Sequence, residues 1–213
     1  MPYNDGGVTV ILIYRAAVHP AGCPGLSGFV EELPGPIRAP RVFMSVLTIK
    51  NCLDPVLRKK CDLIQNINQG LVTLSEDMIE TMYAATGAGL AANQVGIASR
   101  LIVVDLGFRE EKHDPLIIVN PVITASEEEQ TGQEGCLSIP EVYADVKRFQ
   151  RVEVKGVDLD GNDVRLEADG FLARAFQHEM DHLEGKLFWD MLGKVKRDML
   201  KRKFKKILKE TQE

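Results

Sequence analysis

The chain has 213 residues, 45% of them hydrophobic, and a formal net charge of -5 at pH 7. This length and hydrophobic content predict one domain of ordinary size with a proper core. The acidic balance argues against general binding to nucleic acid, DNA included, and the sequence shows neither a signal-peptide pattern nor a membrane-length apolar run.

The first 43 residues differ from the rest of the chain. An apolar run at Val8–Tyr14 has the character of a strand, but closely spaced Pro and Gly residues follow it and oppose regular structure. No basic segment precedes the run, as a secretory signal requires, and Glu31 and Glu32 weaken the match to a transit peptide. We therefore expect residues 1–43 to be a poorly ordered extension, with Met44 as the natural start.

Residues 45–50 are expected to form a short strand or an extended arm. Downstream, the stretch Thr73–Glu76 resembles a capping box, so a helix is predicted to begin there and to end at Gly87. Cys52 and Cys61 have no paired spacing and no neighbouring histidine, which favours small buried side chains over metal ligands. Unpaired cysteines also indicate free thiols in a reducing compartment.

Several apolar and β-branched runs downstream predict strands. The stretch Asp160–Asn162, with the sequence DGN, predicts a hairpin turn between two of them. The acidic run Glu127–Glu129 is expected to be a solvated loop. The predicted strands lie at residues 101–106, 116–119, 142–148, 151–159 and 163–166.

The stretch His178–His182 has the pattern H-E-x-x-H. On a helix, residues i and i+4 share one face, so His178 and His182 can bind the same metal ion. Glu179 then lies beside the first ligand, within reach of a water on the metal. The helix is predicted to begin near Asp169 and to be buried among strands, since it is mostly apolar. By itself, this pattern predicts a metallohydrolase.

A catalytic site of this type needs a third protein ligand and one open position. No histidine follows His182, so the candidates are Glu184 and Asp190 downstream, or Cys136 upstream, whose thiolate is a good soft ligand. The residues alone leave this choice open. They also leave the role of Gln94 open, because its side-chain amide can either donate a hydrogen bond to a developing oxyanion or have a purely structural role.

Three stretches taken together resemble the peptide deformylase family. The family's motifs G-Φ-G-Φ-A-A-x-Q, E-G-C-Φ-S and H-E-Φ-D-H stand here at residues 87–94, 134–138 and 178–182, and the resemblance extends from about Met44 to Leu192. It implies an α+β fold in which antiparallel sheets pack around a central metal-binding helix. The chain then divides into the extension at 1–43, a catalytic domain at 44–192 and a basic amphipathic helix at 193–213.

The resemblance also implies the metal site and the reaction. The ligands are expected to be Cys136, His178 and His182, holding one divalent ion that is natively Fe(II), with Zn, Ni or Co able to replace it. The expected activity removes the formyl group from the N-terminal N-formylmethionine of newly made polypeptides and releases formate. In this reaction a metal-bound hydroxide attacks the formyl carbon, with Glu179 as the general acid and base.

Further residues are assigned by the same resemblance. The Gln94 amide and the Leu137 N–H are expected to stabilise the oxyanion beside the metal, and Asp181 is expected to support the ligands. Many bacterial members have Arg where Tyr143 stands, so a substrate-backbone contact at that position does not carry over. The residues expected to bind the extended substrate are Ala88, Gly89, Ile139 and Phe171.

The basic stretch Lys194–Lys209 carries a helical apolar stripe on an otherwise acidic protein. It predicts either a solvated, packed helix or a docking surface for RNA, and the resemblance implies the ribosome near its exit tunnel. The expected location is the bacterial cytoplasm, with organelle targeting by residues 1–43 as the alternative.

Two rival classes of protein share parts of this pattern. A zincin-type peptidase would use the same helix with a downstream acid as the third ligand. A metal-binding relative without turnover is the other, and the intact Glu179 and Gln94 argue against it.

Overall fold

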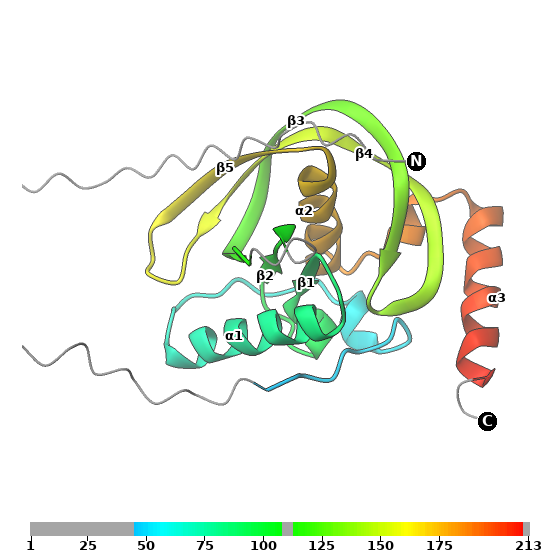
Figure 1. The fold of residues 1–213 in the computed structure, drawn as a ribbon, viewed down its shortest axis with the longest axis horizontal. Coiled ribbons are helices and arrows are strands. Elements are labelled where there is room, and N and C mark those ends of the chain that lie inside the picture. Colours follow the sequence, from blue (N-terminus) through cyan, green and yellow to red (C-terminus); the bar gives the residue numbers. More distant parts are fainter. Residues whose placement is uncertain (1–44, 108–112, 211–213) are drawn as a thin grey trace, which may run out of the picture.

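The computed structural model describes residues 45–107 and 113–210, so the extension predicted at 1–43 lies outside the described residues. Within these ranges the chain forms a five-stranded antiparallel sheet and three α-helices (Figure 1). The strands are β1 (Gly89–Ala91), β2 (Leu101–Val104), β3 (Leu116–Cys136), β4 (Ile139–Val157) and β5 (Asp163–Asp169). The helices are α1 (Gln69–Ala84), α2 (Gly170–Leu183) and α3 (Lys194–Glu210), with 3-10 turns η1 (Pro55–Arg58), η2 (Ala92–Val95) and η4 (Phe188–Met191).

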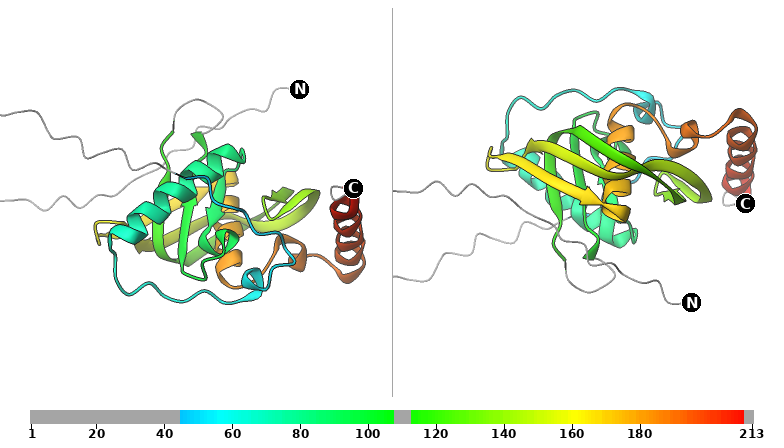
Figure 2. Two further views of the ribbon diagram at one scale, coloured as in Figure 1. Left: turned by 90° about the horizontal axis from the view of Figure 1, so that it is seen from below. Right: turned by 90° about the horizontal axis from the view of Figure 1, so that it is seen from above.

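The sheet places its strands in chain order, each antiparallel to the next. β3 and β4 form one long hairpin whose tight turn, at Leu137 and Ser138, directly follows Cys136. This hairpin bends around α2, so that strands lie on more than one side of the helix (Figures 1 and 2). The predicted α+β fold with a central helix is confirmed, with one bent sheet in place of the several expected.

β2 separates two parts of the core, because successive side chains point to opposite faces of a strand. Ile102 and Val104 pack in the cluster that contains Phe176 of α2. Leu101 and Val103 pack in the cluster that contains the buried side chains of α1. Alternation within this short strand therefore places α2, the helix with the histidine pair, and α1 on opposite faces of the sheet.

α3 lies at one end of the molecule, beside the β3–β4 hairpin (Figure 2). It packs through Leu200 and Phe204 against Val142 and Val146 of β4 and against Trp189 of η4. The basic C-terminal stretch is therefore a helix that is partly anchored in the core. Within the described ranges, no helix combines the length and the apolar character that a bilayer-spanning segment needs.

Three local predictions are wrong. The strands predicted at 142–148 and 151–159 are one continuous strand, β4. α1 begins at Gln69 rather than near Thr73, because Asn68 is the N-cap and its side chain accepts a hydrogen bond from the Leu71 amide. The acidic run Glu127–Glu129 lies inside β3 instead of in a loop, where basic side chains of β4 pair with it across the hairpin.

Other local predictions are confirmed. Cys52 and Cys61 are buried, and burial raises the pKa of both thiols to about 11. Residues 45–50 form an extended arm, whose Lys50 amide donates to the Gln94 carbonyl. The arm is thereby attached to the segment that carries the first of the three motifs.

Candidate metal centre

The candidate ligands come from two elements of the fold. Cys136 is the last residue of β3, and His178 and His182 lie one turn apart on α2. The three ligand atoms all lie within 4.8 Å of one another, and Cys136 Sγ is 3.2 Å from His182 Nε2. Burial lowers the pKa of His182 well below its ordinary value. Burial acts in the same direction on His178, but hydrogen bonds with Cys136 and Glu134 outweigh it and raise the pKa. A metal ion needs both rings as neutral ligands. Two imidazoles and a thiolate fit a catalytic site with an open position.

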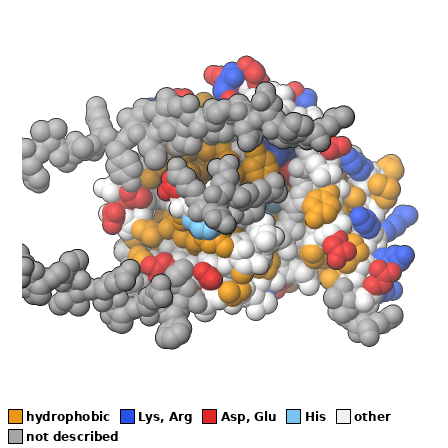
Figure 3. Space-filling model, viewed as in Figure 1, with side chains coloured by type: hydrophobic (Ala, Val, Ile, Leu, Met, Phe, Trp, Pro, Cys, Tyr) orange, Lys and Arg blue, Asp and Glu red, His pale blue; other side chains and the backbone are white. Residues whose placement is uncertain are grey.

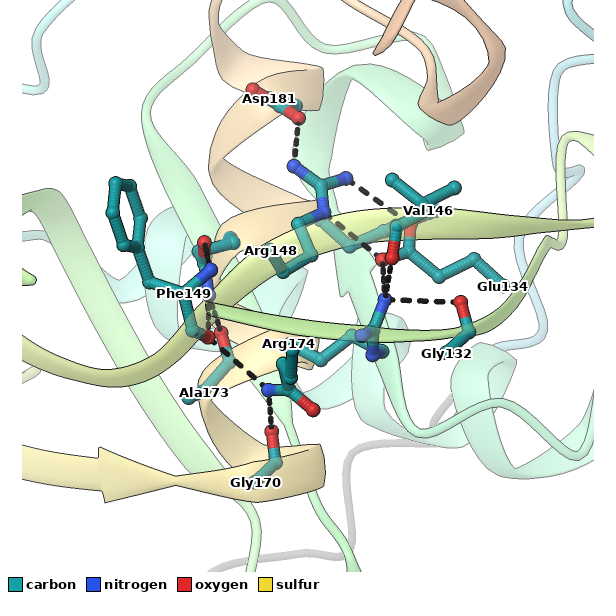
Figure 4. Close-up of polar contacts among 12 residues, drawn as sticks. Gly132, Glu134, Val146, Arg148, Phe149, Gly170, Ala173, Arg174 and Asp181 are labelled. Atoms are coloured by element: carbon teal, nitrogen blue, oxygen red, sulfur yellow. Dashed lines mark hydrogen bonds and ion pairs between the residues drawn. The ribbon is translucent and has the colours of Figure 1, made fainter. Parts of the chain in front are cut away.

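A buried acid orients the first histidine. Glu134 Oε2 is 3.0 Å from His178 Nδ1, which leaves Nε2 free to face a metal. Two buried arginines hold the carboxylate: Arg148 donates through Nε at 2.9 Å and Nη2 at 3.1 Å, and Arg174 through Nη1 at 2.7 Å (Figure 4). Burial raises the pKa of Glu134, but hydrogen bonds from His178 and Arg148 outweigh it and lower the pKa to about 2. The carboxylate therefore stays charged beside the ligand.

Glu179 is buried on α2, next to the first histidine. Its Oε2 has no hydrogen-bond partner among the described residues, and its side chain lines the same cavity as His178 and Cys136. Burial raises the pKa of Glu179 to about 7, against the opposing charge of His178. A carboxyl group with this pKa and a free oxygen can both accept and return a proton near neutral pH.

The amide of Gln94 faces the candidate ligands. Its Nε2 is 3.6 Å from Cys136 Sγ and 3.3 Å from Ser138 Oγ. Its Oε1 accepts a hydrogen bond from the Ala91 amide at 2.8 Å. Because the carbonyl end is held in this way, the NH2 donor group points toward the cysteine. Leu137, the other predicted oxyanion residue, follows Cys136 directly and lines the same cavity as Gln94.

A cavity of about 670 Å³ opens onto two of the candidate ligands, Cys136 and His178. Its walls come from the segment after α1, the β3–β4 turn and the first turns of α2. Ile139 is fully buried in this wall, whereas Phe171 is 54% exposed and lies at its surface. Tyr143 also lines the cavity and is 58% exposed. All four predicted substrate residues line it, namely Ala88, Gly89, Ile139 and Phe171.

The two acids considered as rival ligands lie outside this cluster. Glu184 pairs with Arg100 and Lys60, and Asp190 pairs with Arg58. In the part of the chain that the structure describes, the cluster able to hold a metal contains neither acid. The geometry therefore favours the cysteine as the third ligand.

Sequence reasoning missed the network around Glu134. The sequence predicts Asp181 as the support of the ligands, but its carboxylate pairs with Arg148 and reaches His178 only through Glu134. Arg174, one helical turn before His178 on the same face, has no predicted role at all. The available signal was the place of Glu134 in the cysteine motif, two residues before the ligand in the sequence.

Known proteins resemble this chain in sequence and in fold. The polypeptide deformylase family model matches residues 46–198. The peptide deformylase of Syntrophobacter fumaroxidans is 50% identical over 167 residues, which are 78% of this chain and 98% of that protein. The crystal structure of a peptide deformylase from Legionella pneumophila gives a TM-score of 0.75 at 41% identity, covering 78% of this chain and 98% of that one. The crystal structure of a peptide deformylase from Synechococcus elongatus in complex with actinonin gives a TM-score of 0.68 at 45% identity, covering 71% of this chain and 83% of that one.

Proposed function

This chain belongs to the polypeptide deformylase family, and from that premise we propose how its own residues carry out the reaction. It is a hydrolase that removes the formyl group from the N-terminus of newly made polypeptides and releases formate. One observation supports the assignment of the site above all others. Cys136, His178 and His182 bring their ligand atoms within 4.8 Å of one another beside a buried acid, Glu179.

Cys136, His178 and His182 hold one divalent metal ion in this proposal. When bound, the ion supplies Lewis acidity and an activated water. We assign Fe(II) as the native ion because the resemblance to the family implies it, and the thiolate and the two imidazoles would also accept Zn, Ni or Co. Metal analysis of protein purified without oxygen tests this choice, and zinc as the only metal found would contradict it.

The substrate binds as an additional strand. β1, which contains Gly89, lies at the edge of the sheet that the described residues form, and Gly89 lines the cavity. An extended formylmethionyl peptide pairs with this edge through its main chain. Its methionine side chain enters the cavity between Ala88, Ile139 and Phe171. Main-chain pairing explains how one enzyme accepts many different nascent chains.

Glu179 moves the protons. Its carboxylate is buried beside His178, with one oxygen unpaired among the described residues, so that it can accept a proton from the attacking water and deliver it to the leaving amine. The Gln94 Nε2 and the Leu137 amide donate hydrogen bonds to the oxyanion that forms on the formyl group. Losing one such donor typically costs about 10²–10³-fold in rate.

Formate release from a formyl-methionyl peptide tests this function. We expect release by the full chain prepared anaerobically with Fe(II), and roughly 10²–10⁴-fold less by Glu179→Gln, with the metal content unchanged. Glu129→Gln is the matched control, because Glu129 is an exposed acid in a surface pair on β3. Loss of metal from Glu179→Gln would contradict the proton-transfer role. Cleavage of unformylated peptides would identify a zincin-type peptidase instead.

We also propose that α3 docks on ribosomal RNA. Basic side chains gather over α3 (Figure 3), and those that are exposed are Lys194, Lys196, Arg202, Lys203, Lys205, Lys206 and Lys209. Because Leu200 and Phe204 belong to the core, reversing charges is a cleaner test than deleting the helix. Lys205→Glu with Lys209→Glu should weaken co-sedimentation with ribosomes in low salt, whereas Lys59→Glu, an exposed control outside α3, should not. Equal co-sedimentation of all three proteins would count against docking.

The substrate also determines the location. Formylated nascent chains arise where ribosomes initiate with formylmethionine, so we place the protein in the bacterial cytoplasm, with an organelle as the alternative. Residues 44–192 act as the catalytic domain in this proposal, and 193–213 as the docking helix. Subcellular fractionation with and without residues 1–43 distinguishes the two locations.

A further inference from the structure

The proposed metal site is shared by two elements, so its geometry depends on how these are held together. Cys136 ends β3, whereas His178 and His182 belong to α2. Any shift of the β3–β4 hairpin relative to α2 changes the distances between the thiolate and the two imidazoles. The inference that follows rests on the ligand set proposed above.

Arg174 connects the two elements at one point. It lies on α2, one turn before His178, and is only 4% exposed. Its Nη1 is 2.7 Å from Glu134 Oε1, 3.0 Å from the Val146 carbonyl oxygen and 3.3 Å from the Gly132 carbonyl oxygen (Figure 4). Gly132 and Val146 lie directly opposite each other in β3 and β4. One guanidinium nitrogen thus binds both strands of the hairpin.

The hairpin makes room for this guanidinium with a glycine. A Cβ built on Gly132 would lie 3.1 Å from Arg174 Nη2 and 3.3 Å from its Cζ. Nη2 itself has no hydrogen-bond partner among the described residues. Among the described residues the hydrogen bonds of this guanidinium come from Nη1, and the group rests against the bare backbone of Gly132. A methyl group at this position would press on the guanidinium and shift it by a few tenths of an ångström.

Arg148 acts differently, although it contacts the same acid. It comes from β4, and it forms two hydrogen bonds with Glu134 and another with Asp181. Glu134 keeps its bonds with Arg148 when Arg174 is removed, so its charge remains paired. Removing Arg174 would remove the link from α2 to the carbonyl groups of Gly132 and Val146. Gly132 lies on β3 shortly before Cys136.

We propose that Arg174 is a positioning residue for the metal site. It fixes the β3–β4 hairpin on α2 and thereby sets the place of Cys136 relative to the two histidines. Gln177 attaches the hairpin separately, through two hydrogen bonds of 2.9 Å with the Phe149 backbone. The hairpin therefore stays attached when Arg174 is changed. The same three residues remain the ligands, but the distances between Cys136 and the two histidines change.

Cobalt(II)-loaded full-length protein reports this spacing without any substrate. Arg174→Met keeps an apolar stem and removes the donors. We expect it to release Co(II) to a chelator about 10-fold faster than the wild type, because losing a partner behind the ligands typically costs ~10–100-fold in metal affinity. The thiolate-to-cobalt absorption should change as well. Arg165→Met, which replaces an exposed arginine of β5, is the matched control and should release at the wild-type rate.

A double-mutant cycle separates positioning from a general loss of stability. Gly132→Ala should also speed release, because its methyl group presses on the guanidinium and shifts it by a few tenths of an ångström, and it should have no effect once Arg174 is replaced by Met. Arg174→Lys, which keeps one donor, should restore part of the wild-type retention.

Two results would overturn the proposal. One is an equal effect of Gly132→Ala in both backgrounds, and the other is release from Arg174→Met at the rate of the Arg165→Met control. Wild-type cobalt protein without a thiolate band would reject the proposed ligand set, and the inference with it. Formate release is measured separately, so a failure of the proposed activity is distinguished from a failure of the positioning role.

Discussion

Replacing Glu134 with glutamine should remove a large part of the protein's stability. The Glu134 side chain is almost fully buried and accepts hydrogen bonds from Arg148 and Arg174, which are buried as well. Glutamine has nearly the same shape but carries no charge. Arg148 still pairs with Asp181 in the variant, whereas Arg174 keeps no carboxylate partner among the described residues.

Two estimates give the same magnitude for this loss. Breaking a buried ion pair by removing one partner typically costs about 3–5 kcal/mol. The pKa of Glu134 falls from 4.5 to about 2 on folding, and at about 1.36 kcal/mol per pKa unit this shift corresponds to roughly 3 kcal/mol. For a domain of this size, a loss of about 3 kcal/mol lowers Tm by roughly 6–12 °C.

The stabilisation by Glu134 also depends on pH in a predictable direction. Because the pKa of this carboxyl group is lower in the folded chain than in the unfolded one, its contribution is fully present above pH 4.5. The contribution is lost as the pH falls toward about 2. The difference in stability between the wild type and Glu134→Gln should therefore shrink across this range.

Urea and thermal unfolding of the metal-free proteins, from neutral to acid pH, measures both effects. Glu129→Gln is the control, because Glu129 lies on the same strand and pairs with Lys147 at the surface. Such a pair typically contributes about 0–1 kcal/mol. If Glu134→Gln is no more destabilising than this control, or if its effect does not change with pH, then the buried ion pairs of Glu134 do not stabilise the fold as described.

Two further predictions concern the residues around the metal ligands. Gly89→Ala should retain metal but lose most formate release, because a Cβ at this position would lie 2.6 Å from Glu179 Oε1. The measurement is the rate of formate release per bound metal ion. An unchanged rate would contradict the contact between residue 89 and Glu179. In metal-free protein at about pH 8, iodoacetamide should modify Cys136 and spare Cys52 and Cys61, because burial raises the pKa of those two thiols to about 11. Peptide mass spectrometry should show that bound metal protects Cys136, and equally fast modification of all three thiols would disprove the difference.

The histidine pair could be predicted because helical periodicity is local. His178 and His182 are one turn apart, and no residue outside α2 is needed to place them on one face. The choice of Cys136 as the proposed third ligand needed the family resemblance, because Cys136 lies in another element and the residues alone also admitted Glu184 and Asp190. The structure holds both acids away from the cluster, since basic side chains pair with them.

The network around Glu134 could not be predicted, because its members come from β3, β4 and α2. Which arginine meets the acid depends on the register of the long hairpin, and that register shifts at several irregular positions along β3. Local composition does not encode such shifts. The loop prediction for Glu127–Glu129 is wrong for a related reason, because the exposure of these residues could be predicted but their pairing with β4 could not.

The start of α1 shows how tertiary packing selects between local signals. Asn68 and Thr73 are both residue types that cap helices well. The helix begins after Asn68, and this choice places Leu71 in its first turn, where the side chain packs in the core beside Leu90. A sequence pattern that ignores this contact favours the later start.

The position of α3 in the chain has a consequence for the order in which the protein is assembled. Leu200 and Phe204 complete the apolar cluster against which Cys136 packs, yet they follow every other element in the sequence. During translation the hairpin with the thiolate therefore emerges before the helix that covers it. An enzyme that acts on unfinished polypeptides thus depends on a late segment of its own chain, because the hairpin that carries Cys136 is covered only after α3 has left the ribosome.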